Sequence, residues 1–275
     1  MGTFEFDGEK YKRASTHQKE WGRELITRLV LKGNERILDL GCGDGILTEQ
    51  LADLVPSGRT VGIDASAGMI ETAGKIEKDN LEFLHLDINK MDFKEEFDVI
   101  FSNAALHWVK DHERLLRSSY KALKPGGVIL WSFAGEGNCR NFFEVIQRKM
   151  AEKKYAEYFR NFEWPWFMPS EAQYEKLISD KGFDKIQVSI ANRDRFFPSA
   201  EEMAKWIEQP SIVPFIKNIP ENMKESFLRE VTEAMIEKTR QEDGTCFESF
   251  RRIEVYAVKG EKQYDEGENS CRAAL

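Results

Sequence analysis

The chain has 275 residues, of which 41% are hydrophobic and 32% are charged. This length and composition are typical of a globular protein with a sizeable core, and no apolar run approaches the ~20 residues that cross a bilayer. The formal net charge of -8 argues against a nucleic acid as the main partner, because affinity for a phosphate backbone depends on clustered Lys and Arg. Composition therefore favours a small-molecule partner, and it leaves the oligomeric state open.

The start of the chain and its cysteines narrow the class further. The first residues, MGTFEFDGEKYKRAST, lack the apolar stretch of a secretory signal, so we expect a cytoplasmic protein that does not bind membranes. The cysteines form no CxxC pair, which predicts free thiols and no metal site.

The first half of the chain alternates between helical and strand-like segments. An amphipathic helix is expected over residues 15–31, where Trp21, Leu25, Ile26, Leu29 and Val30 recur at helical spacing. Five apolar runs of strand length follow, separated by helical stretches: RILDL (36–40), TVGID (60–64), LEFLHL (81–86), FDVIFSN (97–103) and GGVILWSF (126–133). This alternation predicts a parallel sheet with helices on both faces, and right-handed crossovers make it a doubly wound α/β fold.

The pattern changes after about residue 138. Helical segments are expected over 141–159, 199–209 and 220–240, and strands over 185–197 and 246–260. We expect the two late strands to pair antiparallel at one edge of the sheet, with the helices between them forming a cap. Residues 1–260 then make a single domain, with a ligand-binding core over 11–134, cap insertions at 138–182 and 196–242, and a polar, disordered tail at 261–275.

A glycine-rich loop follows the first strand, in the stretch LDLGCGDG. A nicotinamide dinucleotide fold needs GxGxxG, but here Ile46 stands where the third glycine is required. Asp39 precedes the first glycine, Gly41, by two residues, near the carboxyl end of the strand. A carboxylate there opposes a pyrophosphate but attracts an ammonium group, directly or through water.

LDLGCGDG resembles motif I of the class I S-adenosylmethionine-dependent methyltransferases, and the likeness extends over residues 11–134. GID, ending at Asp64, matches the acid that holds both ribose hydroxyls in that family, LDI at Asp87 and Ile88 matches the adenine position, and KPGG (124–127) matches the turn before strand five. The resemblance implies a Rossmann-like, mostly parallel seven-stranded sheet, S-adenosylmethionine as cofactor and methyl transfer by in-line displacement. The implied cofactor-binding residues are Tyr11, Ser15, Gln18, Asp39, Gly41, Cys42, Gly43, Asp64, Ala65, Met69, Asp87, Ile88, Asn103 and Ala104.

The implied acceptor site lies after strand four, in FSNAALHWV (101–109). The Asp/Asn-Pro-Pro-aromatic box of nucleic-acid amino methyltransferases does not stand there. SNAALHWV and YKRASTHQ (11–18) are instead similar to the carboxyl methyltransferases that act on trans-aconitate, malonyl-carrier and juvenile hormone acid. This resemblance implies that Gln18 and Trp108 border the carboxylate of a small acceptor, as two neutral donors that orient it without neutralising its charge.

Each of these residues also has an ordinary structural interpretation. Trp108 is also compatible with packing in the core, and Gln18 with a solvent-facing position on the helix. Tyr11 is also compatible with a packing contact that holds the N-terminal residues in place. His107 becomes a catalytic base only for a hydroxyl or amine acceptor, because a carboxylate needs none, and we favour a structural role for it. A cofactor-binding sensor without turnover is the rival function.

Two further groups of residues remain open from the sequence. Residues 162–169, FEWPWFMP, form either an apolar pocket wall or a packing wedge. Four arginines on the late strands are candidates for a second acidic group of the substrate, with a solvated edge expected for at least two of them: Arg193, Arg195, Arg251 and Arg252.

Overall fold

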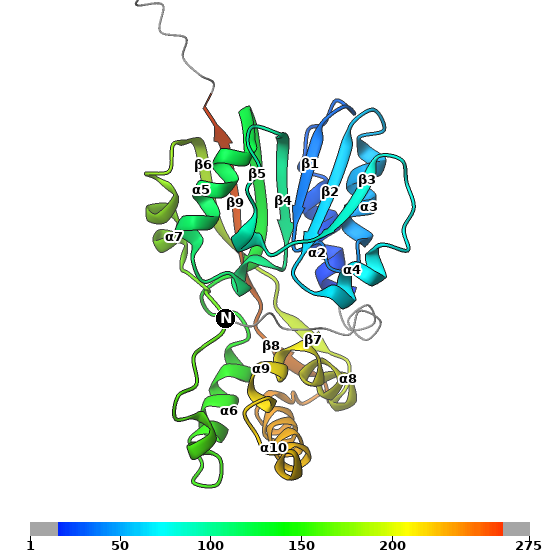
Figure 1. The fold of residues 1–275 in the computed structure, drawn as a ribbon. Coiled ribbons are helices and arrows are strands. Elements are labelled where there is room, and N and C mark those ends of the chain that lie inside the picture. Colours follow the sequence, from blue (N-terminus) through cyan, green and yellow to red (C-terminus); the bar gives the residue numbers. More distant parts are fainter. Residues whose placement is uncertain (1–15, 261–275) are drawn as a thin grey trace, which may run out of the picture.

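The computed structural model describes residues 16–260, and a seven-stranded sheet dominates it (Figure 1). Across the sheet the strands are β3 (Leu81–His85), β2 (Arg59–Asp64), β1 (Arg36–Leu40), β4 (Phe97–Asn103), β5 (Leu123–Ala134), β9 (Arg251–Lys259) and β6 (Phe183–Asn192). The five strands from β3 to β5 are parallel, and β9 runs antiparallel to both β5 and β6. The predicted doubly wound, mostly parallel sheet is confirmed.

The side chains of successive residues in the central strands point to opposite faces of the sheet, as the two-residue period of a strand requires. Ile37 and Val99 pack with Leu25 and Leu51 of helices α2 (Thr16–Ile26) and α3 (Ile46–Leu54) on one face. Their neighbours Leu38 and Ile100 point to the other face, where α5 (His112–Ala122) and α7 (Glu171–Ile178) pack. Both faces are therefore buried, which explains the continuous apolar runs of these strands.

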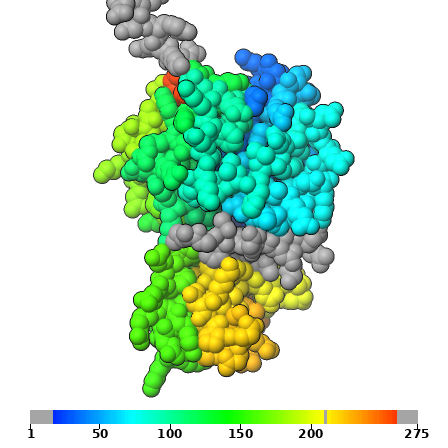
Figure 2. All heavy atoms as spheres, viewed as in Figure 1, coloured from blue at the N-terminus to red at the C-terminus, as the bar shows by residue number. Residues whose placement is uncertain are grey.

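A second, mostly helical body lies beyond the edge at which the parallel strands end (Figure 1). We call residues 138–169 and 195–248 the cap. It contains α6 (Arg140–Met150), η3 (Ala156–Phe159), α8 (Ala200–Trp206), the π-helical turn Ile207–Ser211, α9 (Val213–Ile216), α10 (Glu221–Thr239) and the two-stranded sheet of β7 (Arg195–Phe197) and β8 (Cys246–Glu248). Figure 2 shows it as a separate lobe, and it has an aromatic-rich core of its own.

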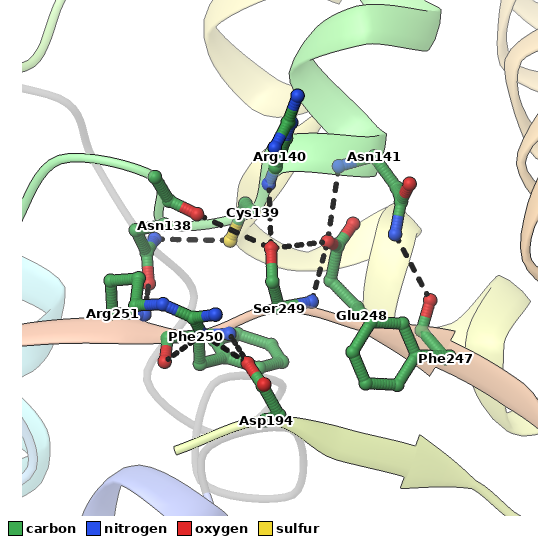
Figure 3. A network of polar contacts seen from close by, with 11 residues as sticks. Asn138, Cys139, Arg140, Asn141, Asp194, Phe247, Glu248, Ser249, Phe250 and Arg251 are labelled. Carbon is green, nitrogen blue, oxygen red and sulfur yellow. Dashed lines mark hydrogen bonds and ion pairs between the residues drawn. The ribbon is translucent and has the colours of Figure 1, made fainter. Parts of the chain in front are cut away.

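Polar contacts hold the cap to the sheet where three connecting segments lie close together (Figure 3). These segments join β5 to α6, β6 to β7 and β8 to β9. The carboxylate of Glu248 is fully buried and accepts from the main-chain nitrogens of Asn141 at 3.1 Å and Phe142 at 2.9 Å. These are among the N–H groups that the first turn of α6 leaves without a partner inside the helix. Beside them, Arg251, the first residue of β9, forms an ion pair with Asp194, which lies between β6 and β7. This pair joins the other two connecting segments.

Several element boundaries differ from the sequence-based expectations. The first helix ends at Ile26, and Val30, expected on its apolar stripe, is 97% exposed. The helix expected over 141–159 is α6 followed by the separate turn η3, and each late strand is divided between the large sheet and the small one. Helix α7 lies within the expected 138–182 insertion, but Tyr174 and Ile178 pack it onto the large sheet. These breaks occur where the chain passes between sheet and cap.

Three further elements, helix α4 (Ala67–Ala73) and the turns η1 (Ile88–Lys90) and η2 (Leu106–Trp108), complete the sheet body. Strand β1 lies between β2 and β4, so the order of the strands reverses between β1 and β4. In open α/β sheets a crevice for ligands forms at the carboxyl ends of the strands at such a reversal. Within residues 16–260, no helix is both long and apolar enough to cross a membrane.

Candidate active site

A pocket opens at this reversal, between β1, β4, the glycine loop and helix α2. Its lining comprises Gln18, Lys19, Asp39, Gly41, Cys42, Gly43, Asp44, Leu47, Asn103 and Ala104. Seven of these were proposed as cofactor-binding residues from the sequence: Gln18, Asp39, Gly41, Cys42, Gly43, Asn103 and Ala104. Lys19, Asp44 and Leu47 were not. Asp44 belongs to the glycine loop, whereas Lys19 and Leu47 reach the pocket through the packing of α2 and α3.

The glycine loop turns sharply over the end of β2. The main-chain nitrogens of Gly41 and Cys42 both donate to the carbonyl oxygen of Ile63, at 2.8 and 3.0 Å. Gly41 has a φ of +74°, and a Cβ there would lie 2.2 Å from the Cβ of Ala105, so no larger residue fits. At Gly43 the position of a Cβ meets nothing within 4 Å. The loop is therefore braced at its start and open toward the pocket at its centre.

Asp39 is an almost fully buried carboxylate at the pocket floor, with 2% of its surface exposed. The hydroxyl of Thr48 donates to its Oδ2 at 2.7 Å. Burial raises its pKa to about 7, and the neighbouring charge of Asp64 adds to that increase. Burial destabilises the ionised form of this carboxyl group, and a cation placed beside it stabilises that form. This environment fits the ammonium group of a methionine moiety.

Asp64 stands at the end of β2 and is held by the main chain on both sides. Its Oδ2 accepts from the nitrogen of Gly43 at 3.0 Å, and its Oδ1 accepts from the nitrogen of Ser66 at 2.9 Å. These bonds fix the plane of the carboxylate. A fixed carboxylate has two oxygens to offer to a vicinal diol, which fits a ribose.

The other proposed cofactor residues on this side flank Asp64. The carbonyl of Ala65 is bonded to His85 at 3.0 Å, and Met69 is buried on α4. Asp87 caps η1 by accepting from the nitrogen of Asn89 at 2.9 Å, and Ile88 packs partly buried against the sheet core. Tyr11 and Ser15 lie outside the described residues.

The carboxyl end of β4 carries a backbone conformation that is unusual for its residue type. Ala104 has a φ of +60°, in the left-handed region that an alanine rarely adopts. Its nitrogen donates to the carbonyl of Ser132 at 2.8 Å, which holds the turn in place. Such conformations occur often where a chain must bend around a ligand site. Here the bend leads directly into η2, which carries His107 and Trp108.

His107 is partly buried. Burial, with the nearby positive charge of Arg252, lowers its pKa to about 3, so the imidazole is neutral at physiological pH. Its Nδ1 is buried and has no hydrogen-bond partner among the described residues. A base with so low a pKa holds a proton poorly, which argues against His107 as a general base.

Trp108 is partly buried and packs against the segment that was expected to be a pocket wall or a wedge. Its ring lies 5.2 Å from the ring of Trp166, which in turn contacts Phe143 and Phe215 of the cap. Phe167, the next residue, packs on the sheet core beside His112. The segment therefore joins sheet and cap through aromatic contacts. It meets η2 at Trp108 and at His107, whose carbonyl oxygen accepts from the main-chain nitrogen of Phe167 at 2.8 Å.

A buried cationic and aromatic cluster lies on the cap side of α2. Arg252 is 4% exposed, and its guanidinium lies 5.5 Å from the centre of the Trp21 ring and donates to the carbonyl of Ser132 at 2.6 Å. The ring of His17 lies 5.0 Å from that of Trp21. Burial, with the charges of Arg195 and Arg252, lowers the pKa of His17 to about 3.

The remaining late-strand arginines have other contacts. Arg193 forms a two-pronged pair with Glu24 at 2.8 Å, and Arg251 pairs with Asp194. The guanidinium of Arg195 lies 5.7 Å from the centre of the Phe197 ring. Arg252 is thus the member of the four that lies buried next to β4.

Comparisons with known proteins agree with this geometry. Residues 38–131 match a family model described as a methyltransferase domain. Trans-aconitate 2-methyltransferase of Variovorax paradoxus is 28% identical over 256 residues, which cover 90% of this chain and 96% of that protein. An uncharacterised methyltransferase of Schizosaccharomyces pombe is 27% identical over 266 residues, covering 92% of this chain and 98% of that protein. The solved structure of phosphoethanolamine N-methyltransferase 2 of Haemonchus contortus superposes with a TM-score of 0.60 at 19% identity, covering 92% of this chain and 57% of that chain.

The strand order, the glycine loop with its acids and these similarities identify the chain as a class I S-adenosylmethionine-dependent methyltransferase. The expected resemblance to trans-aconitate methyltransferases is confirmed by such relatives. The enzyme therefore uses S-adenosylmethionine as its methyl donor, as predicted from the sequence.

Proposed function

We propose that the acceptor is a small organic acid and that the methyl group is transferred to one of its carboxylate oxygens. The observation that carries this proposal is a set of buried polar atoms on α2, which lines the pocket through Gln18, and on η2, which follows β4. His17 Nε2, Gln18 Oε1 and His107 Nδ1 are buried without a hydrogen-bond partner among the described residues. Such atoms are costly unless a ligand satisfies them.

The charge of this region favours an anion. Both histidines are neutral at physiological pH, whereas Arg252 is buried and close enough to lower the pKa of each. Among other contacts, its guanidinium donates to the oxygens of Ser132 and Asn103. The positive charge of this buried guanidinium attracts a carboxylate bound in its neighbourhood.

Gln18 and Trp108 are the proposed acceptor-binding residues. The amide of Gln18 offers two N–H donors as well as its oxygen, since the two ends of an amide exchange by a flip of the side chain. The indole of Trp108 offers one N–H. Held by neutral donors, a carboxylate keeps the electron density with which it attacks.

The cofactor supplies a methyl group on a sulfonium, and attack by the acceptor oxygen forms the new C–O bond while the C–S bond breaks. No proton has to leave a carboxylate in this reaction. The contributions of the protein are therefore positioning of the acceptor and exclusion of water. His107, with its low pKa, suits this chemistry better than the deprotonation of a hydroxyl or an amine.

Trans-aconitate is the first acid to test, because trans-aconitate 2-methyltransferases are 28% identical to this chain. The test is product formation with a panel of mono-, di- and tricarboxylic acids, including trans-aconitate, together with phenols and amines. We expect an acid to be methylated to an ester that releases methanol on treatment with base. Base-stable methylation of an amine or a phenol, with no acid turned over, would refute the proposal.

A further inference from the structure

Helix α2 brings a largely enclosed cation, Lys19, to the proposed cofactor pocket. The ammonium of Lys19 lies 2.6 Å from the Oδ2 atom of Asp44, in the glycine loop, and both residues line the pocket. Their side chains are only 11% and 6% exposed. The pair joins segments 25 residues apart in the sequence, so it depends on how α2 packs.

That packing is tightly constrained. A Cβ at Gly22 would lie 2.3 Å from Leu47 Cδ1 and 2.9 Å from Asn103 Nδ2, so α2 approaches α3 and the end of β4 as closely as a glycine permits. Asn103 Nδ2 also donates to the main-chain oxygen of Gln18 at 2.9 Å. This hydrogen bond and the close packing fix the position of Lys19, the residue after Gln18, relative to the glycine loop.

The cofactor presents two charges at its methionine end, an ammonium and a carboxylate. The buried carboxylate of Asp39 suits the ammonium. Among the described residues that line the pocket, Lys19 is the one Lys or Arg, whereas Asp39 and Asp44 are both acidic. Without a cation, a second negative charge brought into this acidic pocket would be repelled.

We propose that Lys19 binds the methionine carboxylate of the cofactor, with Asp44 holding its ammonium in position. An ammonium has three donors, so it can keep the bond to Asp44 while it donates to a ligand. The inference rests on the cofactor of the enzyme and not on the acceptor proposed above. It adds to the site a residue that the glycine-loop motif does not contain.

The test compares two ligands that differ in this carboxylate alone. Calorimetry gives the dissociation constants of S-adenosylhomocysteine and of its decarboxylated analogue, which keeps the amine, for the wild-type protein and for Lys19→Met and Lys19→Arg. We expect the wild type to prefer S-adenosylhomocysteine by about tenfold or more, the usual effect of a charge-assisted hydrogen bond. Lys19→Met should lose most of this preference, and Lys19→Arg should keep most of it.

The matched control is Arg23→Met, which removes an exposed positive charge from the same helix and should leave the preference unchanged. Equal weakening of both ligands by Lys19→Met would overturn the proposal, because Lys19 would then act only as a fastening of α2. Equal affinity of the wild type for the two ligands would also overturn it. Neither result depends on which acceptor the enzyme methylates, so a failure here is separate from a failure of the carboxylate proposal.

Discussion

The side chain of Asn103 donates from its Nδ2 to the main-chain oxygen of Gln18 at 2.9 Å. Its Oδ1 accepts from the guanidinium of Arg252 at 3.3 Å. One amide at the end of β4 thus links helix α2, which lines the proposed cofactor pocket, with strand β9, which carries the buried Arg252. It couples the two halves of the proposed site.

Replacement of Asn103 by leucine should therefore affect both halves. The change keeps the approximate volume but removes both hydrogen bonds, and it leaves the oxygen of Gln18 without this donor. We expect the free energy of unfolding to fall by about 1–3 kcal/mol and the affinity for S-adenosylhomocysteine to fall as well. Urea unfolding and calorimetric titration measure the two effects. A stable variant with unchanged affinity would show that the link is not needed to hold α2 over the pocket.

Trp108→Phe separates the indole donor from the aromatic packing. The phenyl ring can still contact Trp166, but it has no N–H for an acceptor. We expect a decrease in kcat/KM for the acid substrate of about tenfold, with the affinity for S-adenosylhomocysteine within twofold of the wild type. A comparable loss of cofactor affinity would instead assign Trp108 to the structure of the cofactor pocket.

The affinity for the cofactor should depend on pH through Asp39. Burial raises its pKa from 3.8 to about 7, so the carboxyl group of the free protein ionises only as the pH rises through neutrality. Because the ionised form attracts an ammonium, the affinity for S-adenosylhomocysteine should increase from pH 6 to pH 8. Asp39→Asn should bind more weakly and lose this dependence. Titrations at four or five pH values check both expectations, and an unchanged profile in the variant would contradict them.

The same raised pKa affects stability with the opposite sign. Between pH 3.8 and about 7 the folded protein holds a proton on Asp39 that the unfolded chain has released. The contribution of Asp39 to the free energy of unfolding is therefore present at low pH and is lost as the pH rises through that interval. Bound cofactor should offset this loss, which would appear as a larger ligand-induced increase in Tm at pH 8 than at pH 6.

Glu248→Gln tests the junction between sheet and cap. The carboxylate of Glu248 accepts from three main-chain nitrogens, at 2.7 to 3.1 Å, and an amide has only one oxygen with which to replace it. We expect a loss of about 1–3 kcal/mol in the free energy of unfolding. The matched control is Glu237→Gln, an exposed position of α10, which should have little effect. Equal stability of the two variants would show that Glu248 does not hold the cap.

Local sequence patterns predicted much of the large sheet and many of the residues that line the proposed cofactor pocket. The alternating apolar runs predicted the strands from β1 to β5, because strands buried on both faces must be continuously apolar. The glycines and acids of LDLGCGDG and GID are short-range signals, since the turn and the acids that surround it come from consecutive residues. Seven of the ten pocket-lining residues could be named on that basis and on the resemblance it supports.

The sequence by itself thus determined the fold class, the cofactor and the order of the motifs. Only the tertiary structure decided that Lys19 meets Asp44, that α7 packs on the sheet and that Arg252, rather than Arg193 or Arg251, is buried beside β4. Each of these depends on contacts between segments far apart in the chain, for which no local spacing is diagnostic. The local sequence around a charged residue on a strand or helix does not show whether its side chain is buried or exposed. Burial depends on the other elements that pack against it.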